Sequence, residues 1–312
     1  MTRTSATDPS QDNDTSEPLH TADTLPCVLC FNAVDPVGAG GLSGDALVVA
    51  SVGAHALPVA TGVYLRDTRE TDGHVPIDDG AVADQARMVA EDIPLQTIKV
   101  GFVGSAEALA AIAAFASDYP SVPVIAYMPD LSWWTEDEID SYLDAFRELL
   151  LPQTAVLVGN NTTLRHWLLP ESTTDRHARA TELARAASQL GVSYVLVTGM
   201  PTAGDQVANV LASPEGELLS QNFERIDAAF LGAGDLLSAA LAALLATGSE
   251  LSEAAAEALQ YLDQALDHGF RPGMGRAVAD RLFWAETDDS QTETDDDPPS
   301  IDIPYPFNET KH

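Results

Sequence analysis

Residues 30–68 read CFNAVDPVGAGGLSGDALVVASVGAHALPVATGVYLRDT, in which an apolar run, a glycine-rich loop, a helical pattern and a second apolar run follow one another. The runs at 26–34 and 57–65 have the length and apolar content of buried strands, and 46–54 between them has the spacing of a helix. Parallel strands need a crossover of this kind, usually a helix. The unit therefore predicts an α/β fold with a mostly parallel sheet.

The same alternation continues through most of the chain. Further strands are predicted at 97–104, 122–128, 154–160 and 193–200, and further helices at 80–92, 105–118, 135–150, 163–170 and 175–191. The segment 206–226 breaks this rhythm, because its two extended runs around 214–216 are typical of a hairpin. The segment 235–284 predicts two or three helices. With both faces of the sheet covered, the pattern predicts a three-layer α/β/α domain.

The domain is expected to span 25–285 as a single unit between two acidic tails. The tails, 1–24 and 286–312, are polar and poor in apolar residues, so we expect them to be disordered. Outside them the chain still holds 34 acidic residues against 13 basic ones. An acidic excess of this size on a folded domain suggests a protein that works at high salt, where repulsion between carboxylates is screened.

The net charge also limits the class of partner. With 48 acidic and 15 basic residues the formal charge is −33, which disfavours nucleic acids and anionic membrane surfaces. The chain starts without a basic-then-apolar signal pattern, and no apolar run is long enough to cross a bilayer. We therefore expect a cytoplasmic protein with no nucleic-acid or membrane partner.

Three loops follow predicted strands or open predicted helices. They lie at 35–41, 159–162 and 232–235, the last within FLGAGDLLSAALAALLATG at 230–248. Ligands of doubly wound sheets bind at the carboxyl ends of the strands, near helix N-termini. The 232–235 loop is consistent with an anion site at a helix N-terminus or with a turn in which Asp235 begins the helix. Neither a Walker loop nor a G-x-G-x-x-G dinucleotide fingerprint is present.

Other chemically notable residues have simpler interpretations. Cys27 and Cys30 lie three apart in the first predicted strand, on opposite faces, which favours packing over redox or metal chemistry. Five histidines are scattered without the spacing of metal ligands (His55, His74, His166, His177 and His268). Trp133 and Trp134 either wall a pocket or pack beneath a loop. Arg271 and Arg276, which flank a glycine turn, either contact phosphate or lie on the surface.

The ordered set of motifs resembles the hydroxymethylpyrimidine/phosphomethylpyrimidine kinases, which belong to the ribokinase-like superfamily. The 30–68 block is similar to the family's N-terminal G-[ST]-D-P-S-G-G-A-G block. TIKVGFVGSAEAL resembles its K-I-G-M-L block, and LLPQTAVLVGN its L-L-P…T-P-N block. FLGAGDLLSAALAALLATG resembles G-T-G-C-T-L-S-A-A-I-A, and HGFRPGMGRAVADRLFW resembles the final G-x-G-x-G-P block. The resemblance covers residues 27 to 284 in unbroken order.

This resemblance implies a ribokinase-like kinase that uses ATP and Mg²⁺ to phosphorylate hydroxymethylpyrimidine or its monophosphate, and that forms a homodimer. Asp235 would be the general base, and Gly232, Ala233 and Gly234 would complete an anion hole with it. Substrate contacts fall at Asp35, Gly41, Asp45 and Arg66, and nucleotide contacts at Asn160, Thr198 and Gly273. No residue is assigned to the metal.

Four positions depart from the family pattern. Arg66 replaces a substrate-binding glutamine or glutamate, Thr163 a glutamate that supports magnesium, and Thr198 a lysine. Tyr127 replaces an aspartate, with Asp130 three residues further on. An arginine only donates hydrogen bonds, which suits phosphate or carboxylate better than an aminopyrimidine. Two alternatives therefore stay open: a pyridoxal-type vitamin kinase, and a ligand-binding or regulatory protein with weak or no catalysis.

Overall fold

The structure, a computed structural model, describes residues 25–170 and 178–285. The tails predicted to be disordered, 1–24 and 286–312, lie outside the described residues. Among the described helices, none combines the length and the apolar character that a membrane crossing requires.

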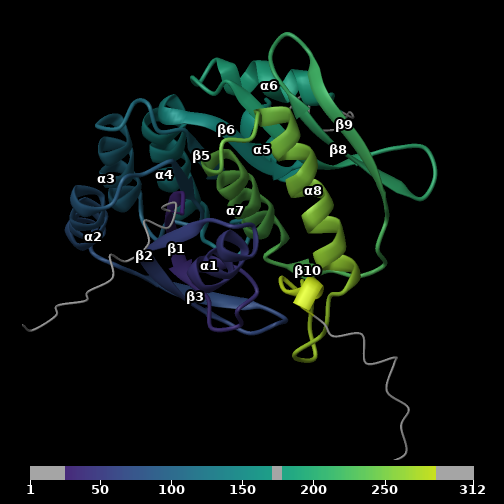
Figure 1. Ribbon diagram of the computed structural model, residues 1–312, viewed down its shortest axis with the longest axis horizontal. Helices are drawn as coiled ribbons and strands as arrows, with labels where there is room; N and C mark the ends of the chain where they lie inside the picture. The colour runs from purple at the N-terminus through teal and green to yellow at the C-terminus, as the bar shows by residue number, and fades with distance from the viewer. Residues whose placement is uncertain (1–24, 171–177, 286–312) are drawn as a thin grey trace, which may run out of the picture.

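A nine-stranded sheet forms the middle of the molecule, in the order β3-β2-β1-β4-β5-β6-β7-β8-β9 (Figure 1). Its six central strands are parallel, and β3, β8 and β9 pair antiparallel at the two edges. The strands are β1 (Cys27–Val34), β2 (His55–Arg66), β3 (Thr71–Pro76), β4 (Thr97–Val100), β5 (Val124–Tyr127), β6 (Thr154–Asn160), β7 (Tyr194–Pro201), β8 (Gln206–Ala212) and β9 (Glu217–Glu224).

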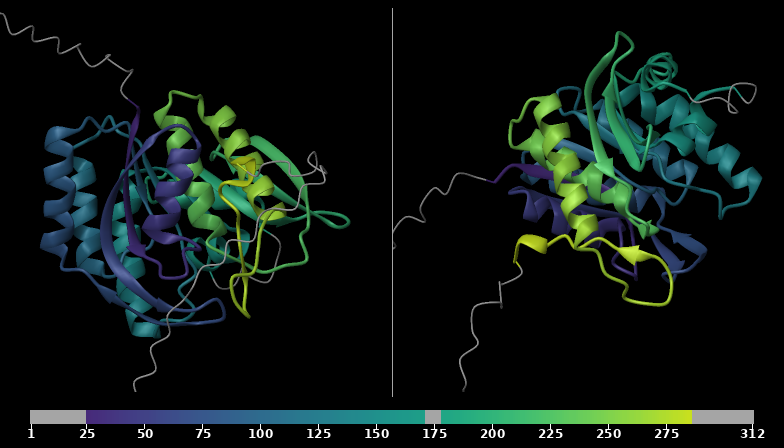
Figure 2. Two further views of the ribbon diagram at one scale, coloured as in Figure 1. Left: turned by 60° about the horizontal axis from the view of Figure 1, so that its bottom comes forward. Right: turned by 90° about the vertical axis from the view of Figure 1, so that its right-hand side faces the viewer.

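Helices cover both faces of this sheet (Figure 2). On one face lie α1 (Gly41–Ser51), α7 (Ala233–Ala246) and α8 (Leu251–Asp267). On the other lie α2 (Asp79–Asp92), α3 (Ala106–Ser117), α4 (Glu136–Ala145), α5 (Asn161–Leu168) and α6 (Ala180–Ser188). The predicted class, a three-layer fold with a mostly parallel sheet, is confirmed, as is the hairpin formed by β8 and β9.

The apolar pattern explains two of these elements directly. In β1 every residue but the last is buried, and Cys27 packs into one core while Cys30 packs into the other, so the free thiols lie on opposite faces. Helix α7 is apolar on all sides, a pattern typical of a fully buried helix. It packs against the sheet, α1 and α8, and most of its residues are buried.

Three strands were not predicted. Strand β3 contains Gly73 and Pro76 in a polar setting, a composition with low strand propensity. It forms because β2 continues beyond β1 and offers β3 an antiparallel partner at the sheet edge. The other two, β10 (Phe230–Leu231) and β11 (Ala277–Val278), pair with each other and are too short to give a periodic signal. A π-helix at 146–150 and 3₁₀ turns at 151–153 and 283–285 complete the fold.

Candidate active site

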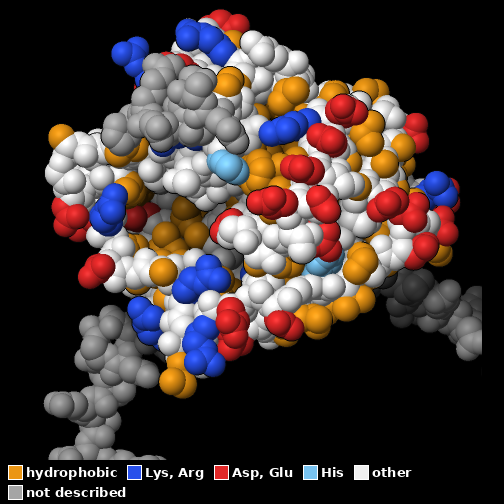
Figure 3. Space-filling model, turned by 180° about the vertical axis from the view of Figure 1, so that it is seen from behind, with side chains coloured by type: hydrophobic (Ala, Val, Ile, Leu, Met, Phe, Trp, Pro, Cys, Tyr) orange, Lys and Arg blue, Asp and Glu red, His pale blue; other side chains and the backbone are white. Residues whose placement is uncertain are grey.

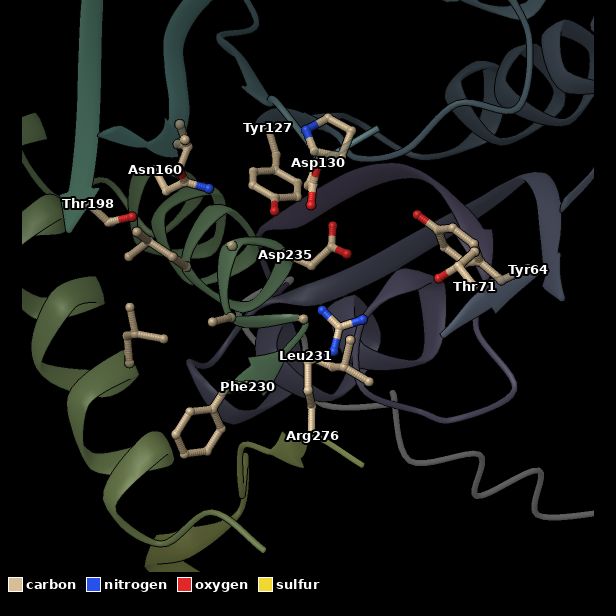
Figure 4. Close-up of a pocket in the computed structure, with 18 of the residues that line it drawn as sticks. Tyr64, Thr71, Tyr127, Asp130, Asn160, Thr198, Phe230, Leu231, Asp235 and Arg276 are labelled. Atoms are coloured by element: carbon tan, nitrogen blue, oxygen red, sulfur yellow. The ribbon is translucent and has the colours of Figure 1, made fainter. Parts of the chain in front are cut away.

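A pocket of about 320 Å³ opens at the carboxyl ends of the parallel strands. Figure 4 shows Asp235 near its centre, Tyr64 and Thr71 at one end, and Asn160 and Thr198 at the other. The pocket is lined by Tyr64, Arg66, Thr71, Tyr127, Pro129, Asp130, Trp133, Val158, Gly159, Asn160, Thr198, Phe230, Leu231, Gly232, Ala233, Gly234, Asp235, Leu237, Leu262 and Arg276.

Two of the glycine-rich loops predicted from sequence meet here. Gly232 begins α7 with a left-handed backbone (φ +75°), and a side chain there would overlap the carbonyl oxygen of Ala39 in the 35–41 loop. The amide of Gly41 donates to Asp235 Oδ2 at 3.3 Å. The backbones of the two loops are therefore in direct contact, although almost 200 residues separate them.

The N-terminus of α7 faces the pocket without a side-chain cap. The amides of a first helical turn have no intrahelical acceptor, and with the helix dipole they favour an anion. The ring of Tyr127 lies so close to Gly234 that a β-carbon at this position would overlap it. The pocket therefore offers a cluster of backbone donors at 232–235, bounded on one side by Tyr127.

The carboxylate of Asp235 is held by side chains that do not line the pocket. Its Oδ1 accepts from Asn32 Nδ2 at 2.9 Å and from Lys99 Nζ at 2.8 Å, while within the described residues Oδ2 has only the longer contact with the Gly41 amide, at 3.3 Å. Burial by itself would raise the pKa of Asp235, but the neighbouring Lys99 ammonium outweighs it and holds the pKa below the ordinary value. Asp235 is therefore an ionised carboxylate that lines the pocket.

Lys99 and Asn32 were not predicted as site residues. Lys99 is fully buried, as is Asp45, and Nζ lies 2.9 Å from both carboxylate oxygens of Asp45. Burial raises the pKa of Asp45 to about 6, against the lowering effect of Lys99. The signal in the sequence was a single lysine within the apolar strand that starts TIKV.

Asp35 and Arg66 form an ion pair beside the pocket. Arg66 Nε and Nη2 donate to the two oxygens of Asp35 at 2.8 and 2.5 Å. Asp35 also accepts from the amides of Val37, Ala39 and Gly40 at 2.8–3.0 Å, so it shapes the glycine loop. The guanidinium lies 4.3 Å from the centre of the Tyr64 ring. Of this pair, only Arg66 lines the pocket.

A family model described as phosphomethylpyrimidine kinase matches residues 35–280. The chain belongs to this family. Its sequence is 28% identical to the hydroxymethylpyrimidine/phosphomethylpyrimidine kinase of Streptomyces coelicolor, over 84% of this chain and 96% of that one. It is 29% identical to a thiamine biosynthesis bifunctional protein of Geobacter sulfurreducens, over 83% of this chain but only 53% of that protein.

Solved structures support the fold of this phosphomethylpyrimidine kinase family member. A pyridoxal kinase of Bacillus subtilis in complex with ADP has a TM-score of 0.73 at 20% identity and covers 84% of this chain and 99% of its own. A phosphomethylpyrimidine kinase of Clostridium difficile has a TM-score of 0.62 at 20% identity, over 77% and 99% of the two chains. The predicted family and the ribokinase-like fold class are thus confirmed.

The pocket brings together some of the residues that the family resemblance singled out. Residues 232–235, Arg66, Asn160 and Thr198 line it. Asp35, Gly41 and Asp45 lie outside the lining. They support Arg66 and Asp235 from behind, because their polar atoms are already bonded to the loop amides, to Arg66, to Lys99 or to Asp235.

Gly273 is also absent from the lining, because its turn packs on Thr68. The Gly275 amide donates to Thr68 Oγ1 at 3.0 Å, and the Arg276 amide donates to the Thr68 carbonyl at 2.9 Å. The packing turns Arg276 to the pocket instead, where within the described chain its guanidinium has no recorded partner. Arg276 therefore brings a positive charge to the pocket, a contribution that the sequence left undecided.

At the far end of the pocket Asn160 caps α5. Its Oδ1 accepts from the Thr163 amide and its Nδ2 donates to Thr163 Oγ1, both at 2.9 Å. Thr163, where the family has a glutamate, is thereby bonded to the cap.

A second cavity of about 210 Å³ lies between β8, β9 and α8 and shares Phe230 and Leu262 with the pocket.

The tryptophans divide between the two roles that the sequence left open. Trp133 lines the pocket, whereas Trp134 packs into an aromatic cluster with Phe102 and Tyr142. Trp134 Nε1 donates to His74 Nδ1 at 3.0 Å, and His74 Nε2 lies 2.7 Å from the Gly104 carbonyl oxygen. His74 therefore links the edge strand β3 to the wall of the pocket.

Carboxylates that could hold a metal are few. Across residues 25–170 and 178–285, no group of three histidine, cysteine, aspartate or glutamate side chains is arranged for a metal ion. Asp130 lines the pocket, is exposed, and uses one carboxylate oxygen to accept from the Ser132 amide at 3.0 Å. One such carboxylate beside substrate phosphates fits the usual manner of Mg²⁺ binding.

Proposed function

We propose that this protein is an ATP-dependent kinase that phosphorylates hydroxymethylpyrimidine, its monophosphate, or both, as part of thiamine biosynthesis. The observation that carries the proposal is the meeting of Asp235 and the uncapped start of α7 in one pocket. A proton acceptor and a set of anion-binding amides at one place are what phosphoryl transfer needs from a protein.

In the proposed reaction the acceptor oxygen attacks the γ-phosphorus of ATP, and the bond from that phosphorus to the β,γ-bridging oxygen breaks. The acceptor proton passes to Asp235 Oδ2, and ADP leaves. The amides of residues 233–235 stabilise the charge on the transferring group. When bound, Mg²⁺ would neutralise phosphate charge, and Asp130 is the residue that would hold it.

The lining suggests which end of the pocket takes which substrate. Tyr64, Arg66 and Trp133 offer aromatic faces and hydrogen-bond donors for the acceptor ring and its substituents. Asn160 and Thr198 offer polar groups for the phosphates of ATP. The adjoining cavity around Phe223, Phe230 and Leu259 is apolar enough to take the adenine base. This assignment keeps Asp235 between the two substrates.

Arg66 favours a second acceptor for the same chemistry. Its guanidinium only donates hydrogen bonds and suits the oxygen substituents of a pyridoxal-type ring better than an aminopyrimidine. We therefore include pyridoxal among the acceptors to be tested. A ligand-binding protein without catalysis is the outcome that would contradict both assignments.

The test is turnover. Purified full-length protein with ATP and Mg²⁺ is offered hydroxymethylpyrimidine, its monophosphate and pyridoxal in separate assays at low and molar KCl. We expect ADP formation with at least one acceptor. Asp235→Asn should lower kcat by about 100-fold or more, the usual contribution of a general base. Asp144→Asn, at an exposed position on α4, is the matched control. Ligand binding without turnover under all conditions would overturn the proposal.

Two further features go beyond the reaction. We propose a homodimer, as the family resemblance implies, and a cytoplasmic location, as expected from the sequence. Sedimentation equilibrium of the full chain tests the first, and a mass of one chain at micromolar concentration would contradict it.

A further inference from the structure

Behind the pocket lies a buried polar cluster, of which the reaction scheme above uses only Asp235. It consists of Asn32 on β1, Asp45 on α1, Lys99 on β4 and Asp235 on α7. Asn32, Asp45 and Lys99 are fully shielded from solvent, and Asp235 is 6% exposed. Only Asp235 lines the pocket.

Two hydrogen-bond donors of the cluster converge on one oxygen of Asp235. Lys99 Nζ has three oxygen acceptors, both oxygens of Asp45 at 2.9 Å and Oδ1 of Asp235 at 2.8 Å, which match its three protons. Asn32 Nδ2 bridges Asp45 and Asp235 at 2.9 Å to each. Asn32 itself is held because its Oδ1 accepts from the Phe102 and Ala33 amides. One oxygen of Asp235 is thus occupied by two donors from behind.

We propose that Lys99 is a positioning residue for phosphoryl transfer, which with Asn32 holds Asp235 Oδ1 so that a charged Oδ2 is presented to the acceptor hydroxyl. This inference rests on the proposed function.

The charge of Lys99 matters because Asp235 is buried. Without a counter-charge, burial would favour the neutral acid, which has no free carboxylate to accept a proton. The Lys99 ammonium reverses this preference and holds the pKa of Asp235 low. Titratable or charged groups around Asp235 from other elements are Cys30, Asp45, Tyr64, Arg66, Tyr127, Tyr142 and Arg281. Unlike Arg66 and Arg281 in this list, Lys99 forms an ion pair with the Asp235 carboxylate, at 2.8 Å.

A role in stability alone does not explain the charges. Replacing a buried ion pair with neutral groups of similar size is often neutral or stabilising, whereas removing one partner is costly. The double variant Lys99→Met/Asp45→Asn removes one positive and one negative charge together. We therefore expect it to fold. Lys99→Gln/Asp45→Asn is a second variant, which keeps a hydrogen-bond donor near Asp235 without the charge.

The experiment compares these double variants with the wild-type protein and with Asp45→Asn, which retains Lys99. The first readout is the pH dependence of kcat/KM for the best acceptor. The second, independent of activity, is the carboxyl ¹³C NMR titration of Asp235, assigned through Asp235→Asn. We expect both double variants to move the acidic limb of the kcat/KM pH profile and the NMR titration of Asp235 upward by about 1–3 pH units. A shift of this size is the usual effect of losing an adjacent opposite charge. We expect kcat of both double variants to fall below the wild-type value at acidic pH and to recover as the pH rises above the new titration midpoint, because Asp235 is then ionised. Asp45→Asn should not move either readout upward.

The two hypotheses fail in different ways. An NMR titration of Asp235 that stays at its wild-type position in folded double variants would overturn the role of Lys99, whether or not the protein is a kinase. A uniform loss of activity at all pH values would do the same, because it indicates a structural role only. Conversely, an NMR titration that moves in a protein without turnover would support the effect of Lys99 on Asp235 and contradict the proposed kinase activity.

Discussion

At the scale of single residues, Gly232 connects the two glycine-rich loops. Its left-handed backbone starts α7, and its α-carbon lies close enough to the 35–41 loop that only hydrogen fits on this side. A substitution meets two separate costs: the backbone strain of a positive φ and the overlap with Ala39. The position therefore couples the fold of the first loop to the anion-binding end of α7.

We predict that Gly232→Ala destabilises the protein by about 3 kcal/mol or more, since both costs apply, and abolishes any turnover. Gly248→Ala is the matched control, because Gly248 also has a positive φ (+94°) but open space around its α-carbon. The control should lose only about 1–2 kcal/mol. Urea unfolding of the two variants measures the difference, and equal losses would contradict the role assigned to the contact with Ala39.

The raised pKa of Asp45 predicts that the stability of the protein depends on pH. Its pKa in the folded protein is raised to about 6, above the unfolded value, so folding takes up a proton between about pH 4 and pH 6. The contribution of Asp45 to stability therefore falls as the pH rises through this range. Between pH 4 and pH 7, the unfolding free energy of Asp45→Asn relative to wild type should increase by up to about 3 kcal/mol. Thermal or urea unfolding at both pH values tests this, with exposed Asp144→Asn as the control. A constant difference would argue against it.

At the scale of elements, the edge strand β3 is held by its pairing with β2 and by the side chain of His74. Because the Trp134 indole can only donate, His74 Nδ1 must accept, and Nε2 then carries the proton that reaches the Gly104 carbonyl. The rings of Phe102, Trp133 and Trp134 lie 4.8–5.7 Å from the imidazole. A strand with low intrinsic propensity is thus held in place, together with the Trp133 wall of the pocket.

We predict that His74→Phe keeps the aromatic packing but loses both hydrogen bonds, which costs about 1–3 kcal/mol. Because Trp133 lines the acceptor end, KM for the acceptor should rise more than kcat falls. Tryptophan fluorescence should also change, since the Trp134 indole loses its acceptor. His55→Phe, at an exposed position of β2 whose side chain makes no hydrogen bond to the described part of the chain, is the control. An unchanged spectrum and KM in the His74 variant would refute the link.

Elements differ in how well the sequence predicts them. The six parallel strands (β1, β2, β4, β5, β6 and β7) and helix α7 follow from continuous apolar runs that only a buried strand or helix can satisfy. No such pattern predicts strand β3, because its stability comes from its pairing with β2 and from the contacts of His74. Similarly, β10 and β11 form only because two segments that are distant in sequence pair with each other.

At the scale of the whole molecule, the net charge is strongly negative. Figure 3 shows acidic side chains spread over one face of the molecule. With a formal charge of −33, repulsion between carboxylates opposes the compact state at low salt. At molar ionic strength the screening length falls to about 3 Å, which removes most of this repulsion.

We therefore predict that raising KCl from about 0.1 to 2 M at pH 7 increases the melting temperature of the full chain. At pH 4, where many carboxylates are protonated, the increase should be smaller. Differential scanning calorimetry of the same preparation under the four conditions measures both effects. A melting temperature that does not rise with salt at pH 7 would contradict adaptation to high salt.

The sequence by itself determined the layered α/β architecture, the family, and the three loops at the carboxyl ends of the strands. Each of these is recorded in local patterns: apolar runs of strand length, helical spacing, and glycines beside helix starts. Asp235 belongs to this group, because it follows a glycine turn at the start of an apolar helix.

Only the tertiary structure decided what surrounds Asp235. Lys99 lies 136 residues from it in sequence, and Asn32 lies 203 residues away, yet both donate to the same carboxylate oxygen. The structure also turned Asp35 toward the loop amides and Arg66, and Arg276 toward the pocket. Such contacts depend on which strands become neighbours and on which rotamers the packing allows, and no local pattern of residues encodes them.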